Sequence, residues 1–295
     1  MFTLAHISDI HLELTTRPHL RALAGKRLTG YLNLSIIRRA AHRDKALASL
    51  LAALGRERHD HLAVTGDLIH LALHDEYLRA RDWLNGLGTP HDISVVPGNH
   101  DIYVWMPPEK GLDLWAENMR GDDGKTGFPY LRRRGPCAII GLSSALVRAP
   151  FRSTGRLGKA QLTRLGQLLE QTRREGLCRV LLIHHPPEQV PTARDKRLTD
   201  ARALSKARAE CGAERGLHGH NHEDSLALAK GPNGPIPVAG GPAASATGMT
   251  RPAPAQFNLY RIAAGGGGWR IAMAAHRLNR KSGRVEKVYD RVLPA

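Results

Sequence analysis

Short apolar runs alternate with stretches of helical periodicity along the first two thirds of this chain, and this alternation most constrains its fold. The runs are rich in β-branched residues and end in turn residues, which is typical of strands. The predicted strands are 3–8, 61–65, 93–96, 137–142 and 179–183. The predicted helices are 44–54, 75–87, 159–175 and 201–210. Strands and helices in alternation favour an α/β protein.

The last third of the chain has a different pattern of residues. Glycine- and proline-rich turns separate short apolar runs at 236–239, 257–262 and 269–274. The segments 231–237 and 265–268 lie between strands, so we interpret them as turns and not as interdomain linkers. We therefore predict one domain over 1–295, with mixed sheets. The polar, glycine-containing segment 121–134 is predicted to be a surface loop.

Polar residues with metal-binding side chains follow the predicted strands. These motifs are Asp9-Ile10-His11, Gly66-Asp67, Gly98-Asn99-His100-Asp101, His184-His185 and His218-Gly219-His220-Asn221-His222. In α/β sheets the carboxyl ends of the strands open into a common crevice, where ligands bind. Five such strand ends would bring these side chains together.

The chemistry of this set points to bound metal. Aspartate supplies a charged oxygen, imidazole suits Zn, Fe, Ni or Mn, and an asparagine carbonyl adds a neutral oxygen. A mixed set without thiolate favours a catalytic site, because structural zinc usually has cysteine ligands. Each motif alone is more often a structural turn or cap. All five in this order reduce that alternative to about one in twenty.

The series of motifs resembles that of the calcineurin-like metallophosphoesterases, which read D-x-H, G-D, G-N-H-[DE], a histidine after a strand, and G-H-x-H. All are present here between residues 9 and 222. The chain looks closest to small bacterial members related to class III cyclic-nucleotide phosphodiesterases. The resemblance implies a four-layer α/β/β/α sandwich of two mixed sheets flanked by helices, with the site at the strand ends.

The resemblance also implies roles for the residues. One metal ion would be held by Asp9, His11 and His222. The other would be held by Asn99, His184 and His220, and Asp67 would bridge the two. His100 would face the leaving-group oxygen, with Asp101 orienting its ring. The position of the following proline selects His184 over His185 as the ligand, and His218 is expected to be structural.

Three functions are compatible with these features. The resemblance favours a phosphodiesterase with two divalent ions, drawn from Mn, Fe, Zn or Co with Mn and Fe preferred, whose hydroxide attacks phosphorus in line. A second is hydrolysis of a lipid-linked phosphoester or pyrophosphate at a membrane surface. The third is a nucleic-acid-binding scaffold without catalysis, because 43 Lys and Arg against 27 Asp and Glu leave a formal charge of +16.

The segment 15–43 departs from the family pattern, since it inserts a basic and apolar stretch after the first motif. It could lie on an anionic membrane and present a lipid phosphoester to the site. The alternatives are a helix or lid packed on the core, or a homodimer contact. Its basic residues are Arg17, Arg21, Lys26, Arg27, Arg38, Arg39 and Arg43.

Substrate contacts are predicted less specifically. Arg148 and Arg152 are candidates to bind a substrate phosphate, and solvated surface arginines are the alternative. His185 is a candidate for a second contact layer or for facing the substrate. Tyr103 and Trp105 could stack on a base or fill the core beneath a loop.

The N-terminal segment carries Asp9, His11 and Glu13 where a signal peptide would be apolar. No run approaches the length of a transmembrane helix, about 18 apolar residues. We expect a cytoplasmic protein, free or peripheral to the inner face of the membrane.

Overall fold

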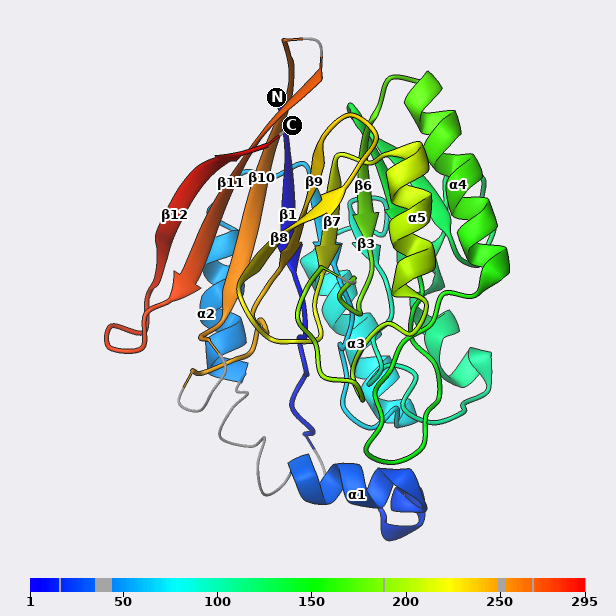
Figure 1. The fold of residues 1–295 in the computed structure, drawn as a ribbon. Helices are drawn as coiled ribbons and strands as arrows, with labels where there is room; N and C mark the ends of the chain where they lie inside the picture. Colours follow the sequence, from blue (N-terminus) through cyan, green and yellow to red (C-terminus); the bar gives the residue numbers. More distant parts are fainter. Residues whose placement is uncertain (16, 35–43, 188, 249–252, 267, 295) are drawn as a thin grey trace.

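The computed structural model describes residues 1–295 except 16, 35–43, 188, 249–252, 267 and 295. Two mixed six-stranded sheets pack face to face, with helices on their outer faces (Figure 1). The first sheet has the order β12 (Val285–Leu293), β11 (Gly268–Leu278), β10 (Gln256–Gly265), β1 (Phe2–Ile7), β2 (His61–Val64) and β3 (Ile93–Val95). The second has the order β4 (Tyr130–Arg134), β5 (Cys137–Gly141), β6 (Cys178–Leu182), β7 (Arg215–His218), β9 (Pro235–Gly240) and β8 (Ser225–Lys230).

Helices join the parallel strands. The α-helices are α1 (Lys26–Asn33), α2 (Asp44–Leu54), α3 (His74–Leu87), α4 (Lys159–Arg174) and α5 (Ala201–Cys211). The 3-10 helices within the described residues are η1 (Leu20–Leu23), η3 (Pro108–Lys110) and η4 (Leu112–Met119). In Figure 1, α2 lies on the first sheet, whereas α4 and α5 cover the second. The predicted α/β/β/α fold class is confirmed.

The central strands are parallel, which sets the position of the site. β1, β2 and β3 run parallel in the first sheet, and β5, β6 and β7 run parallel in the second. Their residues are almost all buried, so these strands do not show the alternation of buried and exposed side chains that a half-exposed strand has. The loops that leave their carboxyl ends are consequently gathered at one end of the sandwich.

One large apolar cluster holds the two sheets together. It contains Leu4 of β1 and Tyr260 of β10 from the first sheet, with Ile139 of β5 and Val180 of β6 from the second. Side chains of α2 and α3, such as Leu50, extend the cluster outward. A second cluster lies beneath α4 and α5 on the other face of the second sheet. The strands that carry the site loops are thus buried on both faces.

The prediction of a surface loop over 121–134 is wrong at its end, where β4 pairs antiparallel with β5. Tyr130 is buried, and its hydroxyl donates to the carbonyl oxygen of Val95 at 2.9 Å. Arg132 is also buried, and its guanidinium donates to the carbonyls of Arg120, Pro90, Ile93 and Glu117. The strand was missed because its sequence contains three consecutive arginines. A charged side chain can nevertheless be buried where backbone carbonyls accept its hydrogen bonds.

Strands β8 and β12 were also absent from the prediction. Both lie at sheet edges, and their side chains are largely exposed in a partly alternating pattern. Edge strands with a solvated face carry a weaker apolar signal than central strands. Among the described residues, no helix has the length and apolar character needed to cross a membrane.

We predict that the buried His61 makes the fold sensitive to acid. Its Nε2 lies 2.8 Å from the Ser94 hydroxyl, and burial, followed by the nearby Arg132, lowers its pKa to about 3. Below pH 6.5 the unfolded chain binds a proton at this residue and the folded chain does not. Protonation of His61 in the unfolded chain should therefore lower the free energy of unfolding by about 2 kcal/mol between pH 7.5 and pH 5.

Urea denaturation of wild type and His61→Gln at these two pH values measures this loss. Glutamine can keep a hydrogen bond to Ser94 but does not titrate. The variant should therefore lose less stability than wild type on acidification, and equal losses would contradict the prediction.

Candidate metal centre

The predicted site residues meet at the carboxyl ends of the parallel strands. Asp9 and His11 follow β1, Asp67 follows β2, Asn99 follows β3, His184 follows β6, and His220 and His222 follow β7. These loops lie at the end of the molecule opposite to the N-terminus (Figure 1). Strands from both sheets thus contribute to one site across the seam of the sandwich.

The backbone at this site is strained. The proposed ligands with positive φ are Asp9 (53°), His11 (47°), Asp67 (55°), His220 (72°) and His222 (56°). This left-handed region is unfavourable for residues other than glycine and persists only where the surroundings enforce it. The N–H groups of Asp9 and His11 donate to the carbonyls of Gly66 and Asp67, each at 2.9 Å, which locks the first two loops together.

Two glycines allow the loops to approach this closely. A Cβ at Gly98 would collide with the Asp67 carboxylate, and a Cβ at Gly219 would collide with the Ser8 hydroxyl. The glycines of the motifs therefore have a packing reason, since only a residue without a side chain fits against the neighbouring loop.

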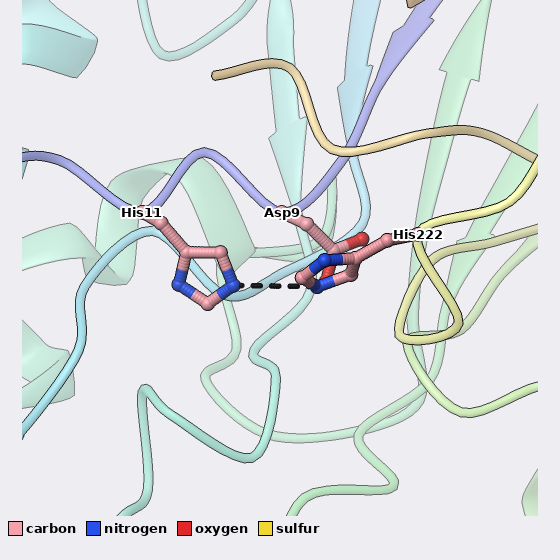
Figure 2. Close-up of side chains that lie close together, drawn as sticks. All are labelled: Asp9, His11 and His222. Carbon is pink, nitrogen blue, oxygen red and sulfur yellow. Dashed lines mark hydrogen bonds and ion pairs between the residues drawn. The ribbon is translucent and has the colours of Figure 1, made fainter. Parts of the chain in front are cut away.

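The first cluster of possible ligands consists of Asp9, His11 and His222. Their ligand atoms all lie within 4.8 Å of one another. Nε2 of His222 is 3.4 Å from Nε2 of His11 and 3.2 Å from Oδ1 of Asp9. Figure 2 shows the three side chains. Asp9 and His11 are buried, whereas His222 closes the cluster from the more exposed side.

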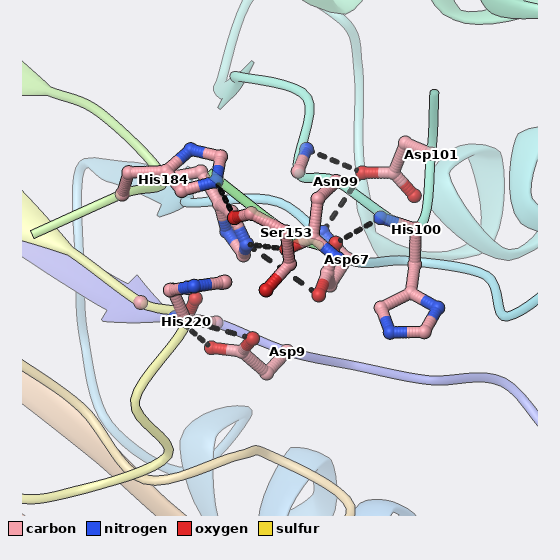
Figure 3. Close-up of polar contacts among 12 residues, drawn as sticks. Asp9, Asp67, Asn99, His100, Asp101, Ser153, His184 and His220 are labelled. Carbon is pink, nitrogen blue, oxygen red and sulfur yellow. Dashed lines mark hydrogen bonds and ion pairs between the residues drawn. The ribbon is translucent and has the colours of Figure 1, made fainter. Parts of the chain in front are cut away.

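The second cluster consists of Asp67, His184 and His220, again with ligand atoms within 4.8 Å. Nε2 of His184 lies 3.4 Å from Oδ2 of Asp67 and 3.2 Å from Oδ1 of Asn99 (Figure 3). Oδ2 of Asp67 is also 3.8 Å from Nε2 of His11 in the first cluster. Asp67 is accordingly the carboxylate that lies between the two clusters.

Hydrogen bonds outside the clusters set the histidine tautomers. Nδ1 of His184 donates to the Thr65 carbonyl at 2.7 Å, and Nδ1 of His11 donates to the Ile69 carbonyl at 3.3 Å. Because a carbonyl only accepts, each Nδ1 carries a hydrogen, and Nε2 is the ring nitrogen that is left to face the cluster. This is the arrangement that metal-binding histidines adopt.

The donor set fits cations. Lone pairs of nitrogens and oxygens face one another over distances that a cation would bridge favourably. The buried Nε2 of His220 has no hydrogen-bond partner among the described residues. Burial lowers the pKa of His220 well below 6.5, so its lone pair is available to a metal ion.

The electrostatics of the second cluster agree with this donor set. Burial raises the pKa of the Asp67 carboxyl, but His184 and His100 outweigh burial and hold the pKa well below its ordinary value. Burial likewise lowers the pKa of His184, but Asp67 outweighs burial and raises it to about 9. The cluster thus holds an anion that favours positive charge beside it.

Asp101 has a different position from the one we predicted. It is fully buried beneath the loop, where its carboxylate accepts backbone N–H groups of Asp67, Leu68, Ile69 and Gly98. These contacts hold the loops after β2 and β3 together. The expectation that Asp101 orients the ring of His100 is replaced by a role in shaping the backbone around Asp67.

The ring of His100 is oriented by two residues that the motifs did not identify for this purpose. Its Nδ1 donates to the carbonyl of His70 at 2.6 Å. The ring also stacks on Tyr103, with centroids 5.5 Å apart and an angle of 3° between the planes. The backbone N–H of His100 donates to Oδ1 of Asp67 at 2.7 Å, which ties it to the cluster.

His70 is a site residue that the sequence analysis missed. Its ring is buried and stacks on His11 with centroids 4.9 Å apart. Its Nε2 lies 3.1 Å from the His11 carbonyl. The only signal in the sequence is a histidine three residues after the Gly-Asp motif, which is too common to be informative.

His185 lies beside the second cluster, where its ring centroid is 4.5 Å from that of His220. This position fits one of the two roles that we considered for it, a second contact layer. Its side chain is fully buried, with Nδ1 2.8 Å from the Ser144 hydroxyl and Nε2 2.8 Å from the Ser153 carbonyl. Both ring nitrogens are therefore engaged by the loop that follows β5. Arg148 and Arg152 lie on this same loop, half-buried and exposed respectively, and Nε of Arg148 donates to the Thr154 carbonyl.

His218 is buried, and its Nδ1 lies 2.9 Å from the Gly219 carbonyl. Its contacts fit the structural role expected for it.

The two neighbouring histidines should behave differently when substituted. We expect His184→Gln to lose bound metal, since it removes a nitrogen that faces Asp67 and Asn99. His185→Gln should keep its metal content, because both of its ring nitrogens are bonded to the loop after β5 and neither faces Asp67. Elemental analysis of both purified variants measures this difference, and metal loss in His185→Gln alone would reverse the assignment.

Comparisons with known proteins complete this description. Residues 2–224 match the family model of the calcineurin-like phosphoesterases. Among solved structures, a dimetal phosphatase from Danio rerio has a TM-score of 0.64 and 17% sequence identity, covering 99% of this chain and 98% of that one. At this identity the likeness shows a common fold.

Another solved structure is less similar. A 5'-nucleotidase precursor from Thermus thermophilus has a TM-score of 0.48 and 14% identity, covering 99% of this chain and 54% of that one. No curated protein sequence matches this chain significantly.

Proposed function

Because this chain belongs to the calcineurin-like phosphoesterase family, we propose that it is a dinuclear-metal phosphodiesterase acting on small phosphodiesters such as cyclic nucleotides. The observation that carries this proposal is the pair of buried ligand clusters with Asp67 between them. A family member that had become only a scaffold would have no use for such a set of facing donors. This speaks against a purely nucleic-acid-binding function.

We assign the two metal ions as the sequence suggests. One ion would be held by Asp9, His11 and His222 and the other by Asn99, His184 and His220, with Asp67 between them. Such a pair of divalent ions would supply Lewis-acid activation of the phosphoryl group and of the attacking water. Mn or Fe suits this set of oxygen and imidazole donors, and Zn or Co is also compatible with it.

The protein's own contribution is to hold the reacting groups. His70 and Tyr103 fix the ring of His100 so that Nε2 would serve the leaving-group oxygen, as proton donor or hydrogen-bond donor. Asp101 keeps the peptide of His100 against Asp67 by anchoring the surrounding loops. Arg148 and Arg152 are proposed to attract the substrate phosphate from the loop after β5.

Hydrolysis of bis(p-nitrophenyl) phosphate tests this proposal. We expect activity that is lost on chelation and restored by Mn²⁺, with slower turnover of the monoester p-nitrophenyl phosphate. Failure to hydrolyse either compound with any of the four metals would contradict the proposal. A metal-loaded screen of cyclic nucleotides, glycerophosphodiesters, nucleotide-sugar lipids and phosphomonoesters would then identify the substrate.

A further inference from the structure

Helix α1 presents its apolar side to solvent, unlike an ordinary surface helix. Leu28 and Leu32, one turn apart, are 47% and 50% exposed, and no residue of the helix is buried. The opposite side faces the protein, because a Cβ at Gly30 would lie 2.7 Å from the Tyr103 hydroxyl oxygen. A surface helix normally turns its apolar stripe to the core. The apolar stripe of α1 is therefore available to something outside the molecule.

Other large apolar side chains are exposed at the same end of the molecule. Trp105 is 76% exposed, and it neighbours Met106, whose sulfur is 3.1 Å from the Arg27 guanidinium of α1. Phe151 is 84% exposed in the loop after β5, and its φ of 63° is unusual for a residue other than glycine. That loop and α1 both lie beyond the carboxyl ends of the strands (Figure 1).

Single exposed apolar residues are normal on a protein surface, but a group of them marks an interaction site. We name this group the apolar rim. It consists of Leu28, Leu32, Trp105, Leu146, Val147 and Phe151.

The segments that carry the apolar rim are basic and contain no acidic residue. The described parts of 15–34, together with 102–108 and 143–158, include no Asp or Glu. Their exposed cations are Arg17, Arg21, Arg152 and Arg156, whereas Lys26, Arg27 and Arg148 are half-buried and donate to groups of the protein. Exposed leucine and aromatic side chains among arginines and lysines are complementary to an anionic bilayer, in which the apolar groups enter the interface and the cations meet lipid phosphates.

The rim is joined to the metal centre. Nζ of Lys26 lies 3.9 Å from the centre of the Tyr103 ring and donates to the Tyr103 carbonyl at 3.2 Å. Tyr103 in turn stacks on His100. On the other side, the loop that carries Phe151 also carries Ser153, whose carbonyl contacts His185. A surface that engages the rim would therefore lie close to the residues that surround the metal centre.

We propose that the apolar rim docks the protein on anionic lipid membranes, so that the metal centre faces the bilayer and acts on phosphodiesters of membrane lipids. The docking surface stands on its own geometry, whereas the lipid substrate rests on the proposed function. The described part of the 15–43 insertion then serves as the membrane contact. Arg38, Arg39 and Arg43 lie outside the described residues and are not needed for this argument.

Flotation with vesicles tests the docking. The metal-loaded full chain is mixed with vesicles of phosphatidylcholine alone, or of phosphatidylcholine with phosphatidylglycerol. We expect binding to the anionic vesicles only, weakened by added salt. The double substitution Trp105→Ser with Phe151→Ser should lower the partition coefficient by about tenfold or more.

A matched pair controls for the loss of exposed apolar area. Leu228 and Val292 are 54% and 61% exposed on edge strands outside the rim, so Leu228→Ser with Val292→Ser should bind the vesicles like wild type. Hydrolysis of soluble bis(p-nitrophenyl) phosphate should be unchanged in both double variants, which shows that they are folded.

Three outcomes would overturn the docking proposal. They are no retention on anionic vesicles, equal retention on neutral ones, and retention that the Trp105 and Phe151 substitutions leave intact. Binding of duplex DNA in place of vesicles would likewise overturn it in favour of a nucleic-acid surface. Vesicle binding without any metal-dependent hydrolysis would sustain the docking surface and reject the proposed function.

Discussion

Replacing Asp67 by alanine is expected to deprive the protein of both metal ions and to lower phosphodiester hydrolysis by about 10³-fold or more. Asp67 lies between the two clusters, 3.4 Å from His184 Nε2 and 3.8 Å from His11 Nε2. Removing the carboxylate leaves the facing imidazoles without the anion that favours cations beside them. Elemental analysis and hydrolysis at saturating Mn²⁺ measure the two effects.

A second substitution separates loss of metal from loss of fold. Asp67→Asn keeps the shape of the side chain and an oxygen for the N–H of His100, but removes the negative charge. We expect this variant to fold and still to bind metal at least about 100-fold more weakly. Asp82→Ala, at an exposed position, is the control and should behave like wild type. Normal metal content and turnover in Asp67→Asn would refute the bridging role.

Replacing His100 by alanine should affect turnover without affecting metal content, unlike the Asp67 substitutions. The protein is expected to keep both metal ions but to lose about 10²- to 10⁴-fold in kcat, the range for a general acid. His100 is held by the His70 carbonyl and by stacking on Tyr103, and its side chain belongs to neither ligand cluster. Metal content and kcat measured on the same preparation test this separation.

The leaving group provides a sharper readout. A p-nitrophenolate needs little protonation, whereas an alkoxide needs much, so His100→Ala should impair an alkyl phosphodiester more than bis(p-nitrophenyl) phosphate. Equal losses for both substrates would show that His100 does not serve the leaving oxygen. His91→Ala, which removes an exposed histidine remote from the site, is the control.

Much of the fold was predictable from local patterns. Helix α2 begins and ends at the predicted residues 44 and 54, because an aspartate precedes its apolar stripe and a glycine follows its end. The parallel strands β1, β2, β3, β5 and β6 were visible as apolar runs, whereas the parallel strand β7 was not predicted, because Arg215 and Gly216 interrupt its apolar character. Strands β4, β8 and β12 were missed because each has an exposed face or a polar run whose burial depends on distant carbonyls.

The site was likewise predictable only in part. Its ligand motifs could be read because metal chemistry restricts the residue types and strand ends restrict their positions. The partners of His100 could not, since both contacts follow from how the loops pack. Asp101 shows this most clearly, because its place beside His100 in the sequence suggested contact with that ring, whereas its carboxylate turns beneath the loop to four backbone N–H groups.

By itself the sequence determined the fold class, the family and the candidate donor residues, because periodicity and residue chemistry are local properties. Only the tertiary structure decided which donors meet, that His185 is buried beneath a loop, and that Leu28 and Leu32 face outward. The pattern of α1 shows an apolar stripe but not its direction. That direction depends on the surfaces against which the helix packs, and here they are Tyr103 and the loop around Leu71 and Ala72.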